Sequence, residues 1–96
     1  MVNYELMYIL DSSLEEDKRN AVQETVQNII TGAGGELGEA DVWGMRKLAY
    51  PIDKKNEGFY VVLPFKADSS LPKELDRRLR INDSVIRHMI INKDAK

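Results

Sequence analysis

Four segments of the chain have the length and composition of β-strands. They cover residues 2–10, 36–50, 58–66 and 85–92, and three of them are rich in Val, Ile, Tyr or Phe. Short apolar runs of this composition, bounded by Gly, Asp, Asn and Ser, are typical of strands. The second segment is of mixed polarity, and Gly44 within it indicates a bulge or a close backbone approach.

Two other segments have the apolar spacing of helices. The first has its apolar residues on one stripe, at Val22, Val26, Ile29, Ile30 and Ala33, and the second at Leu71, Leu75 and Leu79. Such stripes predict helices with one face against a core. We expect a Ser-x-x-Glu capping box to open the first helix, from Ser12 with Glu15 or Ser13 with Glu16. Gly34 is its predicted left-handed cap, and Pro72 belongs in the first turn of the second helix.

The order of these elements is β-α-β-β-α-β, which predicts an α+β fold of the ferredoxin-like type over a single domain, residues 1–96. Right-handed crossovers place both helices on one face of a four-stranded antiparallel sheet. Both faces of the first and last strands carry apolar residues, so the face without helices is also partly apolar. Such a surface usually binds a partner. We expect its partner-facing residues to be Met7, Ile9, Met89 and Ile91.

Charge is unevenly distributed along the 96 residues, whose net charge is −2. Residues 1–43 hold two basic and nine acidic groups, a net of −7, whereas residues 44–96 hold twelve basic and seven acidic groups, a net of +5. This asymmetry suggests a local anionic partner. An equally good interpretation is that the halves of the sequence do not correspond to faces of the fold.

The side-chain inventory argues against an enzyme. The chain has one histidine, His88, and no cysteine, which leaves no metal cluster, no His-paired nucleophile and no sign of a cofactor or a small-molecule substrate. Gly58-Phe59-Tyr60 faintly resembles an RNA-recognition strand, but Glu57 and Pro64 stand where a basic and an aromatic residue are needed. No apolar run reaches the ~18 residues of a membrane span, and no signal peptide is evident, so we expect a cytoplasmic protein.

The segment from Gly44 to Ile52 places two cations, Arg46 and Lys47, and Tyr50 on an extended strand. This strand runs into a polar turn that carries Lys54 and Lys55. Cations along a strand can meet successive phosphates, and a tyrosine can stack or donate a hydrogen bond. A solvated strand with no special role explains the same residues about equally well.

The same segment resembles the signature of a known family. Gly44-Met45-Arg46-Lys47-Leu48-Ala49-Tyr50-Pro51-Ile52 is similar to a motif of the bacterial sixth small-subunit ribosomal protein family. Tyr4-Glu5, Gly58-Phe59-Tyr60 and Ile81-Asn82-Asp83-Ser84-Val85-Ile86-Arg87-His88-Met89 also resemble that family, so the likeness runs from Asn3 to about Lys93. Asp53 departs from the pattern, where a basic or small residue is common.

The resemblance implies a structural constituent of the small ribosomal subunit. Members of the family bind the central domain of small-subunit rRNA and pair with the eighteenth small-subunit ribosomal protein, a small basic protein. Arg46, Lys47, Tyr50 and Arg87 match motif positions, so the resemblance assigns them to RNA or partner contact. Lys54 and Lys55 are added on charge and turn geometry. The alternative is a ferredoxin-like small-molecule sensing or dimerisation module.

Overall fold

The chain folds into two helices and five strands. The computed structural model describes residues 1–52 and 55–94, with the backbone alone for residues 49–52 and 55. In chain order the elements are β1 (Val2–Asp11), α1 (Glu16–Gly32), β2 (Glu36–Leu37), β3 (Asp41–Ile52), β4 (Lys55–Ala67), α2 (Leu71–Arg80) and β5 (Val85–Asn92). The predicted order is confirmed, with the predicted second strand divided into β2 and β3.

The strands form one antiparallel sheet. β4 pairs with β1 on one side and with both β2 and β3 on the other, and β1 pairs in turn with β5. The sheet has five strands rather than the four that we predicted, because the edge strand is interrupted between Leu37 and Asp41. The Gly38 N–H still donates to the Pro64 carbonyl at 2.8 Å, so the chain stays alongside β4 across this interruption.

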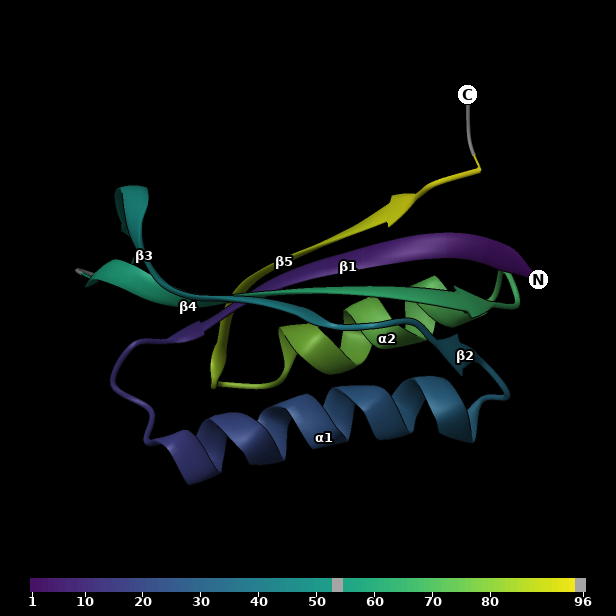
Figure 1. Cartoon of the computed structure of the whole chain (residues 1–96), viewed down its shortest axis with the longest axis horizontal. Coiled ribbons are helices and arrows are strands. Elements are labelled where there is room, and N and C mark those ends of the chain that lie inside the picture. The colour runs from purple at the N-terminus through teal and green to yellow at the C-terminus, as the bar shows by residue number, and fades with distance from the viewer. Residues whose placement is uncertain (53–54, 95–96) are drawn as a thin grey trace.

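Both helices lie on the same side of the sheet (Figure 1). The buried core lies between them and the sheet, and the three leucines of the α2 stripe and the residues Val26 and Ile30 of α1 are buried in it. Ala33 is exposed and does not belong to this core, contrary to the predicted stripe. On β1 the core residues are Tyr4, Leu6, Tyr8 and Leu10. Each buried Leu of this kind contributes about 1.5–3 kcal/mol relative to an exposed one.

The helix ends confirm two of the three predicted signals. Gly34 has a φ of +83°, and its N–H donates to the Thr31 carbonyl at 3.0 Å, as expected of a left-handed cap. Pro72 lies in the first turn of α2. The capping box is wrong: α1 starts after Glu15 with no side-chain cap, and the Ser13 hydroxyl instead donates to the Asp11 carboxylate at 2.8 Å.

Candidate partner and nucleic-acid interface

The helices leave one face of the sheet uncovered, which is called the open face below (Figure 1). The strand register determines which residues lie side by side on it. Side chains of paired residues share a face, so the register defines rows that cross the sheet. One row contains Asp41, Val62, Met7 and Met89, and the next contains Tyr60, Ile9 and Arg87. A third row contains Pro64, Glu5 and Ile91. The centre of the open face is therefore apolar, with charged groups among and around its apolar residues.

Part of this apolar surface is accessible to solvent. Met89 is 45% exposed and Ile91 is 43% exposed, and Met7 is half-buried between them and β4. Three of the four predicted partner-facing residues thus lie on the open face with accessible surface. Accessible apolar groups gathered on one face are characteristic of a binding surface.

Ile9 is different, although it lies in the same face. Only 4% of Ile9 is exposed, so it cannot offer much area to a partner. Gly58 explains the burial, since a Cβ at position 58 would collide with Cγ2 of Ile9 and approach Cδ1 of Ile86 at 3.5 Å. The absence of a side chain there lets Ile9 pack down onto the backbone of β4. Ile9 therefore serves the stability of the sheet more than partner contact.

Two aromatic residues extend the apolar area toward the β3 edge. The rings of Trp43 and Tyr60 stack with centroids 6.2 Å apart and an angle of 6° between their planes. The Trp43 indole N–H donates to the Asp41 carboxylate at 2.9 Å, and Trp43 is 45% exposed. Sequence reasoning missed Trp43, because its place on this face depends on a bulge.

The bulge is at Gly44. The register of β3 against β4 shifts between Val42 and Gly44, and Gly44 has a φ of +80°, a conformation that glycine adopts without strain. The predicted irregularity is thereby confirmed. The extra residue in the strand is Trp43, whose ring stacks on the open-face residue Tyr60. The glycine in the strand was the only available signal for this placement.

The predicted cations do not form one cluster. Arg46 pairs with Gly58 and belongs to the open face, whereas Lys47 pairs with Glu57 and belongs to the opposite face. Arg87 is opposite Ile9, on the far side of the open face from Arg46. Lys54 and the side chains of Tyr50 and Lys55 lie outside the described residues. The structure therefore brings Arg46 and Arg87 to the same face as the apolar rows and places Lys47 on the other.

His88 faces the helices and is held there by α2. Its Nε2 lies 2.6 Å from the Asp76 carboxylate, which also accepts from Arg80 at 3.0 Å. The hydrogen bond from His88 and the nearby Arg80 charge lower the pKa of Asp76. Because His88 already has this partner, its role is to join β5 to α2.

The cations of α2 are paired within the helix. Arg77 and Arg78 both reach the Glu74 carboxylate, at 2.7 and 3.1 Å. These hydrogen bonds lower the pKa of Glu74 to about 2. Since all three side chains are well exposed, the cluster is a solvated surface feature that contributes little to stability.

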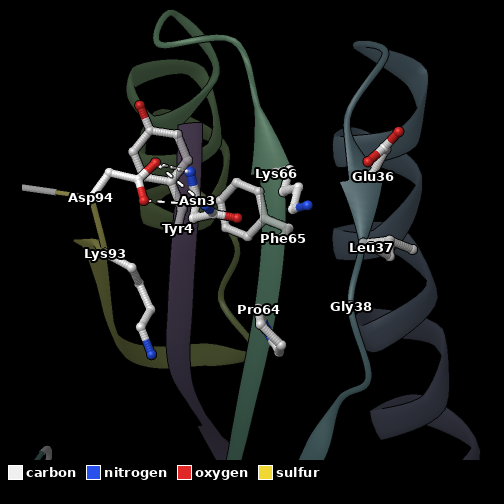
Figure 2. A pocket seen from close by; sticks show the side chains of 10 residues that line it. All are labelled: Asn3, Tyr4, Glu36, Leu37, Gly38, Pro64, Phe65, Lys66, Lys93 and Asp94. Atoms are coloured by element: carbon white, nitrogen blue, oxygen red, sulfur yellow. Dashed lines mark hydrogen bonds between the residues drawn. The ribbon is translucent and has the colours of Figure 1, made fainter. Parts of the chain in front are cut away.

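A shallow hollow of about 470 Å³ lies at the end of the sheet where β1 begins (Figure 2). The stacked rings of Tyr4 and Phe65, 5.5 Å apart, are among its lining groups. On one side the Asp94 carboxylate accepts hydrogen bonds from the backbone N–H of Asn3 at 2.9 Å and from the side-chain amide of Asn3 at 3.1 Å. These bonds lower the pKa of Asp94 and tie the segment after β5 to the start of β1.

In the part of the chain that the structure describes, no three His, Cys, Asp or Glu residues are grouped so that they could hold a metal ion. None of the described helices is long and apolar enough to cross a membrane.

Comparisons with known proteins agree with this geometry. Residues 3–92 match the model of the family described as ribosomal protein S6. The small ribosomal subunit protein bS6 of Clostridium acetobutylicum is 53% identical over 92 residues, covering 96% of this chain and 97% of the relative. The protein of the same name from Alkaliphilus metalliredigens is 54% identical over 91 residues, covering 95% and 96%.

A solved structure also matches over nearly the whole chain. The crystal structure of 30S ribosomal protein S6 from Thermotoga maritima superimposes with a TM-score of 0.91 at 33% identity, covering 96% of this chain and 87% of the other. The ferredoxin-like arrangement and the similarity to these proteins define a structural protein of the small ribosomal subunit, not an enzyme. The chain belongs to the ribosomal protein S6 family.

Proposed function

We propose that this protein stabilises folded rRNA of the small ribosomal subunit, in the cytoplasm, as a heterodimer with the eighteenth small-subunit ribosomal protein. The observation that carries the proposal is the open face, where accessible Met89 and Ile91 share one surface with Arg46 and Arg87. Apolar area suits a protein partner, and cations suit phosphate. The target RNA is the central domain of the small-subunit rRNA.

Pairing with a basic protein accounts for the charge of the chain. A net charge of −2 does not favour RNA binding by the protein alone. A cationic partner on the open face would supply much of the missing charge and cover the apolar rows. In this arrangement Arg46 contacts RNA at the β3 side of the open face. Tyr50, Lys54 and Lys55 are proposed as further RNA contacts from the sequence alone. Lys47 lies on the opposite face of the sheet and is the weaker candidate.

RNA contact is tested by a salt titration of the heterodimer on central-domain rRNA. Each phosphate contact contributes about 0.7–0.9 to the slope of log K against log salt. Arg46→Glu should weaken binding and reduce the slope by about 1. Lys18→Glu makes the same charge change on the exposed surface of α1 and should have little effect. A slope of zero for the native protein would favour a small-molecule sensing or dimerisation module instead.

Protein pairing is tested separately with Met89→Asp. Burying an unpaired carboxylate in an apolar interface is costly, so this change should abolish the heterodimer in analytical ultracentrifugation. Ile81→Asp is the matched control, because Ile81 is 69% exposed and follows α2, away from the open face. A normal heterodimer with Met89→Asp would refute the proposed interface. Both variants should retain the native melting temperature within a few degrees.

A further inference from the structure

The strongest feature that the proposed function leaves unexplained is the fixed indole of Trp43. One side of the ring stacks on Tyr60, and its N–H is bonded to Asp41 at 2.9 Å. These two contacts hold the indole in a defined orientation, while 45% of the residue remains exposed. A large aromatic side chain that is already ordered loses little conformational entropy on binding, which is characteristic of a hot-spot residue.

Trp43 ends an acidic stretch of the chain, in which Asp41 is the carboxylate that contacts it. Glu36, Glu39 and Asp41 are all exposed, and residues 36–43 contain no basic group. Lys66 of β4 pairs with Glu36 at the far end of this stretch. The basic residues of this edge begin only after Gly44, with Arg46 and Lys47. The edge of the sheet is therefore divided. Trp43 lies at the acidic end, and the β3–β4 hairpin, proposed to contact RNA and called the basic hairpin below, lies at the other end.

This combination suits a guanidinium group. A cation is attracted to the face of an indole, and tryptophan is the best of the aromatic residues in this respect. A guanidinium is planar, so it can stack on the ring and also donate hydrogen bonds to the neighbouring Asp41 carboxylate. The ammonium group of lysine has the same charge but is not planar, so it cannot stack on the ring. A nucleobase would bring its phosphate toward the Asp41 carboxylate, which repels it.

We propose that Trp43 and Asp41 form a receptor for an arginine side chain of the basic partner protein. This inference rests on the proposed heterodimer and adds the chemistry of its anchor. Tyr60 stacks against one side of the indole. Asp41 orients the ring through its hydrogen bond and would neutralise the charge of the bound guanidinium. The receptor also helps to direct the partner to the acidic end of the edge, which leaves the basic hairpin free for RNA.

The chain contains one tryptophan, so its fluorescence reports on this site directly. Titration with the eighteenth small-subunit protein of the same organism should change the emission of Trp43 and give a Kd. Trp43→Leu, followed by calorimetry, should raise the Kd by about 10- to 30-fold, the loss expected for a desolvated cation–π contact. Asp41→Asn should raise it by about 3- to 10-fold, because the amide oxygen can still accept the indole N–H but carries no charge.

The control is Val42→Ala, which changes an adjacent exposed apolar residue and should leave the Kd within about twofold. In the partner, each arginine is then changed singly to lysine. One of these changes should weaken binding, and its effect should not add to that of Trp43→Leu, since both remove the same contact. Circular dichroism confirms that each variant is folded.

The outcomes separate the two proposals. If the native proteins do not associate, the proposed heterodimer is wrong. If they associate and the Kd is insensitive to Trp43→Leu or to every arginine change, the heterodimer stands and the arginine receptor is wrong. If Trp43→Leu leaves pairing intact but weakens RNA binding, the ring contacts a base instead, which also overturns the receptor.

Discussion

Leu6 and Met7 are neighbours on β1, and their side chains lie on opposite faces of the sheet. Leu6 is fully buried beneath the helices, whereas Met7 is half-buried on the open face. The residues beside Met7 repeat the contrast, since Val62 is half-buried and Met89 is 45% exposed. Both faces are rich in apolar groups, so composition alone does not distinguish them. The two faces differ because the helices cover only one of them.

The difference shows how one sheet can serve two purposes. On the helix side, apolar area is removed from water during folding and stabilises the monomer. On the open face, much of the apolar area stays in water and becomes available when another molecule binds. A substitution should therefore affect mainly folding on the first face and mainly assembly on the second.

Leu6→Ala against Ile91→Ala should give the largest contrast in stability. Leu6→Ala leaves a cavity in the core and should lower the free energy of unfolding by about 2–5 kcal/mol. Ile91, 43% exposed on the open face, should lose less than about 1 kcal/mol. Urea denaturation measures both. Equal losses would mean that the open face is a second core of the monomer.

Ile9→Ala refines the comparison, because Ile9 is a buried residue on the open face. We expect a loss of about 2–4 kcal/mol in urea denaturation, similar to a core residue. Met89→Ala, on the same face and 45% exposed, is the control and should have a much smaller effect on stability. If the two variants are equally stable, Gly58 does not hold Ile9 in the packed position inferred above.

Gly44→Ala tests whether the bulge places Trp43. A Cβ at either Gly44 or Gly32 would meet no atom within 4 Å, but only Gly44 has a positive φ. Alanine at 44 should therefore cost about 1–2 kcal/mol in thermal denaturation and alter the emission of Trp43. Gly32→Ala should be neutral or stabilising by about 0.4–1 kcal/mol. Unchanged emission in folded Gly44→Ala would contradict the role assigned to the bulge.

Glu74→Gln should have the smallest effect, which appears only in acid. Arg77 and Arg78 lower the pKa of Glu74 from 4.5 to about 2. The stability from a lowered carboxyl pKa is present above the unfolded value and is lost as pH falls through the folded value. Urea midpoints between about pH 4.5 and 2 should thus depend less on pH in Glu74→Gln. Glu24→Gln on α1 makes the same change of charge, and an identical flattening there would contradict this assignment.

Much of the fold could be predicted from local signals. The two apolar stripes, the Gly34 cap and Pro72 each determine a short segment by themselves, and the structure confirms them except for Ala33, which is exposed. The capping box failed because a nearer partner was available: the Asp11 carboxylate accepts from both the N–H and the hydroxyl of Ser13. A motif match does not reveal such competition.

The open face was harder to predict, since it depends on contacts between strands. Because side chains alternate between the two faces of a strand, Arg46 and Lys47 must lie on opposite faces. The prediction of one basic group overlooked this alternation. The burial of Ile9 depends on Gly58, far away in sequence, and the position of Trp43 depends on how Gly44 shifts the register. These features become visible only when the pairing of β1, β3 and β4 is known.

The bonds between Asn3 and Asp94 have a practical consequence for handling the molecule. They fasten the segment after β5 to the start of β1, so both ends of the described chain emerge at the same end of the sheet, opposite the β3–β4 hairpin (Figure 1). A dye, tether or affinity tag fused to either terminus would therefore project away from the basic hairpin. Because Asn3 and Asp94 are hydrogen-bonded, a short linker would also suffice to connect these two segments, with new ends opened elsewhere on the surface.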